Sequence, residues 1–145
     1  MKQAPSDVFI HSDCAVPISK LPALIAGTQN LITAATPMGS KWFCANVGHV
    51  GDGNVHCAII CWAEDKELAE AVIKQICRLA LSLEGTVMGE HGVGMKLRDM
   101  LEEEVGSVGV GVGVMRSIKE ALDPRGIVNP GKVFVLEEGD AKAKL

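Results

Sequence analysis

The stretch Gly48-His49-Val50-Gly51-Asp52-Gly53-Asn54-Val55-His56 decides the fold that we predict for this chain. Its Asp-Gly pair at 52–53 is a strong signal for a two-residue hairpin turn, because such turns need residues that tolerate a positive φ. The flanking runs 42–47 and 55–62 are largely apolar and contain no proline. The sequence therefore predicts an antiparallel hairpin centred on Asp52 and Gly53.

That register places His49 and His56 directly opposite each other, with Cβ atoms about 4.5–5.5 Å apart on one face of the sheet. Two imidazoles at this spacing can reach one metal ion. Histidines on a hairpin are more often simply packed or solvated, so the pair alone leaves both interpretations open. The same register opposes Cys44 and Cys61 on the other face, where we expect buried thiols.

A second histidine motif, Gly89-Glu90-His91-Gly92-Val93-Gly94, strengthens the metal interpretation. Its glycines allow the backbone to approach a ligand closely, and a Glu-His pair is unusual in a simple apolar turn. Two histidines and one carboxylate would leave open positions on a metal, as catalytic sites require.

The remaining elements complete an α+β fold. Apolar residues at helical spacing predict helices over 21–32 and 64–83, and a short strand follows at 86–88. The order strand, helix, strand, strand, helix, strand predicts a ferredoxin-like antiparallel sheet with helices on one face. Further helices are expected near 94–104 and 112–122, joined by a Val-Gly-rich loop.

Composition excludes several functions. The formal net charge of −4 and the 3% aromatic content argue against a nucleic-acid surface. No stretch approaches the roughly 20 apolar residues of a membrane span, and the start of the chain carries no secretory signal. Five cysteines, an odd number without a CxxC pair, argue against a disulfide framework.

Three motifs occur in an order that resembles a known family. They are His49-Val50-Gly51-Asp52-Gly53-Asn54-Val55-His56, Gly89-Glu90-His91-Gly92-Val93-Gly94 and Asp123-Pro124-Arg125-Gly126-Ile127-Val128-Asn129-Pro130-Gly131-Lys132. Together they resemble the C-terminal region of the FAD-linked D-2-hydroxyacid dehydrogenases, and most of all their cytochrome-type D-lactate dehydrogenase branch. The segment that begins Asp13-Cys14-Ala15-Val16-Pro17 also fits, so the resemblance runs from about Asp13 to Phe134. It divides the chain into a domain at 1–135 and a flexible charged tail at 136–145.

The resemblance implies a chemistry for these motifs. A D-2-hydroxyacid would present its C2 hydrogen to FAD, which accepts a hydride, and His91 matches the family's catalytic base. His49, His56 and Glu90 match its metal ligands, for zinc or manganese. The alternative for His91 is that it only orients Glu90 or the loop.

Other positions carry two interpretations each. Asn54 matches a substrate-binding position, yet a positive-φ turn residue is at least as good an account of it. Asn129 and Lys132 resemble the family's segment near the flavin, and a rigid turn that anchors the C-terminus explains them equally well. Ala58 stands where the 2-hydroxyglutarate branch has a substrate-contacting asparagine, which disfavours that substrate.

Nothing in this chain resembles the family's FAD-binding domain, which precedes this region in relatives. We therefore expect a fragment that is inactive alone, whose partners are the small hydroxyacid and its own FAD-binding domain. The family implies a mitochondrial location in a eukaryote, and otherwise a cytoplasmic or membrane-peripheral one. The alternative function is a non-catalytic binding or scaffold module, like relatives named for association with actin, with self-association through an exposed domain interface.

Overall fold

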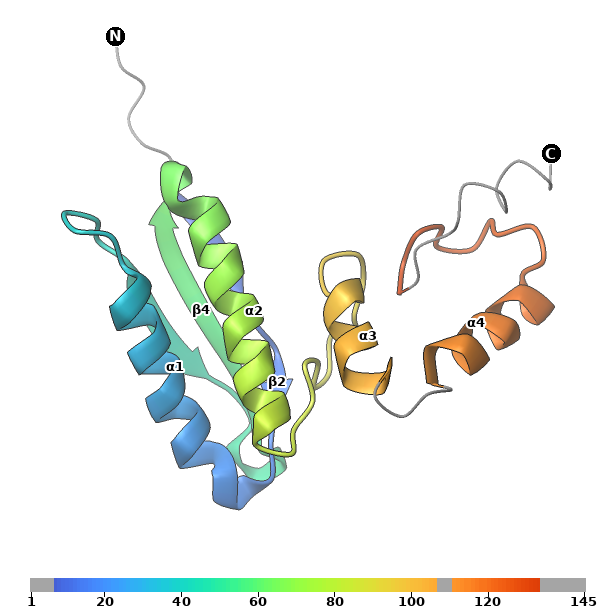
Figure 1. Ribbon diagram of the computed structural model, residues 1–145, viewed down its shortest axis with the longest axis horizontal. Helices are drawn as coiled ribbons and strands as arrows, with labels where there is room; N and C mark the ends of the chain where they lie inside the picture. Colours follow the sequence, from blue (N-terminus) through green and yellow to red (C-terminus); the bar gives the residue numbers. More distant parts are fainter. Residues whose placement is uncertain (1–6, 107–110, 134–145) are drawn as a thin grey trace, which may run out of the picture. The chain divides into compact units, whose positions relative to one another are not determined.

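A computed structural model of the chain describes residues 7–106 and 111–133. These residues form two compact units, one up to His91 and the other from Gly92 onward, and each is described by itself. The elements of the first unit are β1 (Asp7–His11), β2 (Cys14–Ala15), α1 (Leu21–Ala35), β3 (Phe43–Val47), β4 (Asn54–Trp62) and α2 (Lys66–Ser82) (Figure 1). The predicted hairpin strands and both long helices are confirmed.

β4 is the centre of the antiparallel sheet. β3 pairs along one side of it, and β1 and β2 pair one after the other along its other side. Thr86 and Met88 form bridges to Ala15 and Asp13, so the short strand expected at 86–88 is reduced to two isolated bridges. This arrangement confirms the ferredoxin-like α+β prediction.

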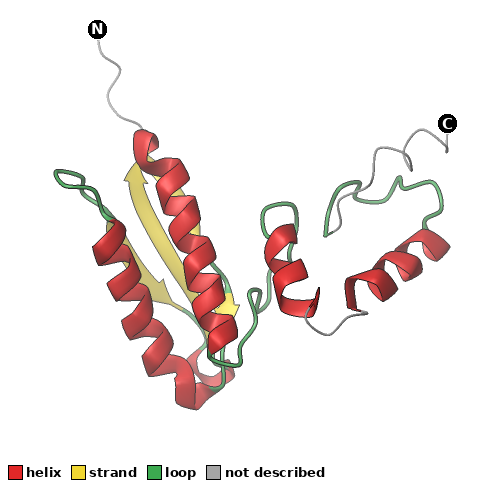
Figure 2. Ribbon diagram, viewed as in Figure 1, coloured by secondary structure: helices red, strands yellow, loops and turns green. Residues whose placement is uncertain are grey.

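Both long helices cover the same face of the sheet (Figure 2). The reason lies in the alternation along β4, where every second side chain is buried and the intervening ones are partly exposed beyond Asn54. The buried side chains of β4 are Val55, Cys57, Ile59 and Cys61, and those of α2 are Ala69, Val72, Ile73, Ile76, Cys77 and Ala80. His56 belongs to the alternate set, so it lies on the face without helices.

The predicted hairpin register is wrong by two residues. Val47, not His49, is the partner of His56, and Ile59, not Cys61, is the partner of Cys44. The connection is a six-residue loop at 48–53 that contains a 3₁₀ turn, and not a two-residue turn. Gly53 has φ +72°, and a Cβ there would lie 2.0 Å from the carbonyl oxygen of Val16, so this position requires glycine.

The error left the faces of the strands unchanged, because a slip of two residues preserves the side on which each side chain lies. Cys44 and Cys61 therefore share the face opposite His56, as predicted. Cys61 is buried and Cys44 is half-buried, and none of the five cysteines, all of which are described, forms a disulfide. Burial raises the pKa of the Cys44 and Cys61 thiols.

The second unit contains α3 (Arg98–Gly106) and α4 (Gly111–Leu122), which confirms two further helices near the predicted positions. After α4 the chain folds back within this unit: the Val133 amide donates to the Gly94 carbonyl at 2.7 Å, and Arg98 Nη1 donates to the Gly131 carbonyl at 2.9 Å. Residues 107–110 of the Val-Gly-rich run and the tail at 136–145 lie outside the described residues. The division at residue 135 stays a prediction.

Candidate active site

The loop at 48–53 and the start of β4 place the first two histidines of the site. His56 projects from β4 on the face that the helices leave open, with 17% of its side chain exposed. His49 lies in the loop, with 61% of its side chain exposed. The ring centroids are 6.2 Å apart, so the two histidines converge although they are not opposite each other in the ladder.

Glu90 and His91 reach the same place from the segment that follows α2. The Gly89 amide donates to the Asp13 carbonyl at 2.6 Å, which fixes this segment beside β2. Glu90 Oε1 then lies 3.0 Å from His56 Nε2 and 3.7 Å from His49 Nε2. The structure thus brings together all four residues that the sequence proposed as metal ligands and base.

His91 completes the site at its exposed edge. Its Nε2 lies 3.5 Å from Glu90 Oε1, and its ring centroid is 5.2 Å from that of His56. His11 on β1 follows at 6.4 Å from the His91 ring. The four histidines of the chain therefore form a row, in the order His49, His56, His91, His11.

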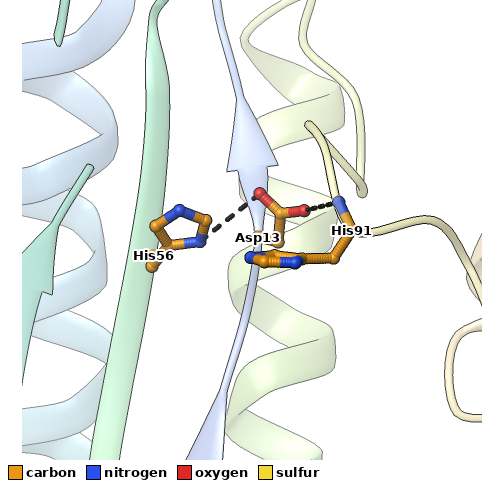
Figure 3. A group of neighbouring side chains, drawn as sticks. All are labelled: Asp13, His56 and His91. Atoms are coloured by element: carbon orange, nitrogen blue, oxygen red, sulfur yellow. Dashed lines mark hydrogen bonds and ion pairs between the residues drawn. The ribbon is translucent and has the colours of Figure 1, made fainter. Parts of the chain in front are cut away.

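Asp13 is the central residue that the sequence analysis missed. Its carboxylate, with 2% of the side chain exposed, lies between His56 and the backbone nitrogen of His91 (Figure 3). Oδ2 accepts the amide protons of Glu90 at 2.9 Å and His91 at 2.8 Å. Oδ1 accepts a hydrogen bond from Asn54 Nδ2 at 2.6 Å and lies 3.4 Å from His56 Nδ1.

These contacts keep the Asp13 carboxylate ionised. Burial by itself raises the pKa of Asp13, because desolvation disfavours the charged form. The two backbone amides, the Asn54 amide and the neighbouring His56 act in the opposite direction and together lower the pKa below its ordinary value. A buried negative charge therefore faces the inner nitrogen of His56.

Two overlapping groups of side chains could hold a metal ion among the described residues. One is the predicted set His49, His56 and Glu90, and the other consists of Asp13, His56 and His91. In each group the candidate ligand atoms all lie within 4.8 Å of one another. The groups share His56 but use opposite sides of its ring: Nε2 faces Glu90 and Nδ1 faces Asp13.

Asn54 is the first residue of β4 and is 5% exposed. Its side-chain nitrogen is committed to Asp13, and the positive φ that the alternative interpretation assigned to Asn54 belongs to Gly53. A Cβ on Gly89 would lie 2.1 Å from Asn54 Nδ2, so glycine at 89 allows the amide to reach Asp13. A substrate contact for Asn54 stays a prediction.

Asn129 and Lys132 lie in the second unit and form a turn. The Lys132 amide donates to the Asn129 carbonyl at 3.2 Å, and Asn129 has φ +48°. Both side chains are exposed. These features agree with the rigid-turn interpretation, and binding of a cofactor by the two residues stays a prediction.

Comparison with known proteins shows the family of this chain. Residues 1–133 match the family model described as FAD linked oxidases, C-terminal domain. The chain belongs to this family. The chain is 43% identical over 139 residues to "D-lactate dehydrogenase [cytochrome], mitochondrial" of Kluyveromyces lactis. The aligned region covers 96% of the chain and 23% of that relative.

Two further relatives are similar to the chain. "Probable D-lactate dehydrogenase, mitochondrial" of Danio rerio is 39% identical over 95% of the chain and 27% of its own length. "D-lactate dehydrogenase [cytochrome] 1, mitochondrial" of Saccharomyces cerevisiae is 41% identical over 85% of the chain and 20% of its own length. The chain therefore spans about a quarter of the length of the curated relatives it matches. Within the described residues, every helix is too short or too polar to cross a bilayer.

Proposed function

We propose that this chain forms the substrate-side part of a flavin-dependent dehydrogenase that oxidises a D-2-hydroxyacid, most specifically D-lactate to pyruvate. The observation that carries the proposal is the convergence of His49, His56 and Glu90, with His91 beside them, on one face of the sheet. The names of the three relatives support D-lactate as the substrate.

The donor set fits a divalent cation. A neutral imidazole carries one N–H, yet His56 faces a carboxylate oxygen at each ring nitrogen, Asp13 Oδ1 and Glu90 Oε1. A proton on Nδ1 satisfies Asp13, and a cation held by His49, His56 and Glu90 satisfies the other side. Zinc or manganese bound there would polarise the hydroxyl and carboxylate of the substrate.

His91 is the proposed general base. Its imidazole is 60% exposed, so it can reach a substrate that sits over the open face, and histidine is the residue type that most often serves as a general base. In the reaction the hydroxyl proton moves to a ring nitrogen of His91, the C2–H bond breaks and the C2=O bond forms. Bound FAD supplies the acceptor for the hydride that leaves C2.

The proposal also covers the flavin-binding partner and the cellular location of the protein. A flavin-binding region is the proposed partner of the open sheet face, and the second unit, through Asn129 and Lys132, is proposed to lie near the flavin. The three relatives are named as mitochondrial proteins, which supports a mitochondrial location in a eukaryote.

One surface favours the alternative, a non-catalytic binding module. Phe9 and Phe43 are each 61% exposed and flank Ile60 across the open face of the sheet. Isolated apolar side chains are common on surfaces, but a row across three strands is typical of a contact surface. Self-association through this row would appear as a concentration-dependent mass in sedimentation that Phe9→Ser/Phe43→Ser abolishes.

A chimera tests the enzyme proposal. This chain replaces the region that it matches in the Kluyveromyces lactis relative, and flavin absorbance shows that the chimera is assembled. We expect oxidation of D-lactate but not of L-lactate. A flavin-loaded chimera that is inactive on D-lactate and on other D-2-hydroxyacids would refute the proposal.

Two variants of the chimera separate the base from a ligand. His91→Ala should lower turnover about 10²–10⁴-fold and leave the metal content unchanged, because it removes a general base. Glu90→Ala should lower metal content and turnover together, and added metal should partly restore both. If His91→Ala loses the metal and Glu90→Ala keeps it, the two roles are reversed.

A further inference from the structure

We propose that Asp13 is a positioning residue for the metal site: its carboxylate fixes the tautomer of His56 and the backbone of Glu90 and His91, and does not itself bind the metal. The inference rests on the cation site proposed above. It begins from the burial of a carboxylate whose two oxygens contact both segments that form the site.

Oδ1 acts on His56. It lies 3.4 Å from His56 Nδ1, and as an acceptor it favours a proton on that nitrogen. A neutral ring with its proton on Nδ1 presents the lone pair of Nε2, which lies 3.0 Å from Glu90 Oε1. The carboxylate therefore selects the tautomer that can bind a metal together with Glu90 and His49, as carboxylate–histidine pairs do behind other metal sites.

Oδ2 acts on the second motif. It accepts the amide protons of two successive residues, Glu90 and His91, which fixes the peptide from which both side chains project. The Gly89 amide, bonded to the Asp13 carbonyl, ties the same segment to the same residue. One residue thus places a proposed ligand and the proposed base.

The same contacts argue against Asp13 as a ligand. A carboxylate offers about four lone-pair sites. Three of those of Asp13 accept hydrogen bonds from the amides of Glu90 and His91 and from Asn54 Nδ2, and His56 Nδ1 lies 3.4 Å from Oδ1. With 2% of the side chain exposed, no side of the carboxylate remains open for a cation. The group Asp13, His56 and His91 would therefore have to break these bonds to bind metal.

The tautomer of His56 in the zinc-loaded chain tests the proposal directly. Zinc is diamagnetic, so long-range ¹H–¹⁵N correlation spectra can show which ring nitrogen carries the proton and which binds metal. We expect the proton on Nδ1 and zinc on Nε2. Zinc on Nδ1 would mean that Asp13 is a ligand and would overturn this inference alone, whereas absence of zinc binding at these histidines would overturn the cation site with it.

Asp13→Asn provides the second test, because it preserves the shape of the side chain but removes one acceptor oxygen and the charge. We expect the Nδ1–H tautomer to lose its dominance and zinc affinity to fall about 10–100-fold. Asp52→Asn is the matched control, since it makes the same chemical change on the exposed loop beside His49. A purely structural role would lower thermal stability but leave zinc affinity and tautomer at wild-type values, and that result would overturn the proposal. If Asp13→Asn does not fold, the wild-type tautomer still decides.

Discussion

Asp13 in the first unit and Asp123 in the second each accept hydrogen bonds from two successive backbone amides, but the other contacts of the two carboxylates differ. Asp13 accepts the amides of Glu90 and His91, and Asp123 accepts those of Ile127 at 3.1 Å and Val128 at 2.9 Å. In both cases one carboxylate fixes the peptide between two successive residues of a glycine-containing motif.

The other contacts of the two carboxylates distinguish their roles. Asp123 pairs with the ammonium group of Lys119, which also donates to the Val128 carbonyl at 2.7 Å, so the charge is neutralised within the turn that it closes. Asp13 has a neutral amide and an imidazole instead, and its charge is directed at His56. A carboxylate paired with lysine stabilises a turn, whereas a carboxylate that faces histidine also influences which ring nitrogen of that histidine carries the proton.

The largest expected effect comes from removing each carboxylate. Asp13→Ala should destabilise the first unit by about 3 kcal/mol, because each buried donor that loses its partner costs about 1–3 kcal/mol. Asp123→Ala should cost less, because its bonds to the Ile127 and Val128 amides lie in exposed surroundings where water can replace the carboxylate. Hydrogen exchange resolved along the chain measures both units in one experiment. An equal loss in the two variants would remove the distinction between them.

The contact between Asn54 and Asp13 can be broken by a substitution at Gly89, which belongs to neither residue of the pair. Gly89→Ala places a Cβ 2.1 Å from Asn54 Nδ2 and 3.0 Å from Asp13 Oδ1, so the amide must leave the carboxylate. We expect a loss of about 1–3 kcal/mol, typical of overpacking, together with weaker zinc binding. Gly51→Ala is the matched control: a Cβ there meets nothing within 4 Å, and the change should stay within about 0.5 kcal/mol. Equal unfolding midpoints in urea for the two variants would contradict this account.

The smallest effect concerns pH at the second unit. The hydrogen bond from Lys119, and after it those from the Val128 and Ile127 amides, lower the pKa of Asp123 from an ordinary 3.8 to about 2. Because the folded pKa is the lower one, the stabilisation is complete above about pH 4 and is lost as the pH falls towards 2. The amide signals of Ile127 and Val128 should titrate near pH 2, and Lys119→Met should move that midpoint upward. A midpoint that Lys119→Met leaves in place would exclude the lysine as the cause.

The sequence predicted the strands of the hairpin and the long helices because each has a repeating apolar pattern of its own. It missed the register, because Asp52-Gly53 resembles a two-residue turn and nothing local shows that Gly53 must pass close to Val16. The convergence of His49 and His56 was nevertheless predicted, since the slip of two residues kept His56 on the open face.

Asp13 could not be assigned from the pattern of the chain, because its partners lie 41 to 78 positions away and meet only in the fold. Its signal was present but weak: one acidic residue between the apolar strand residues Ile10 and Cys14, both of which are buried. A carboxylate in such a position is rarely buried without partners, and that rule is the one that would have found it.

The zinc affinities of His49→Ala and His91→Ala test the central claim most directly, because each variant removes a ligand from only one of the two possible groups. The two side chains are almost equally exposed, 61% and 60%, so truncation should perturb folding to a similar extent. By calorimetric titration at neutral pH, we expect His49→Ala to lose more than about 100-fold in affinity, which exceeds the usual effect of changing a residue that only orients a ligand. His91→Ala should bind zinc as the wild type does. Retained affinity in His49→Ala with loss in His91→Ala would place the metal on Asp13, His56 and His91 and contradict the account.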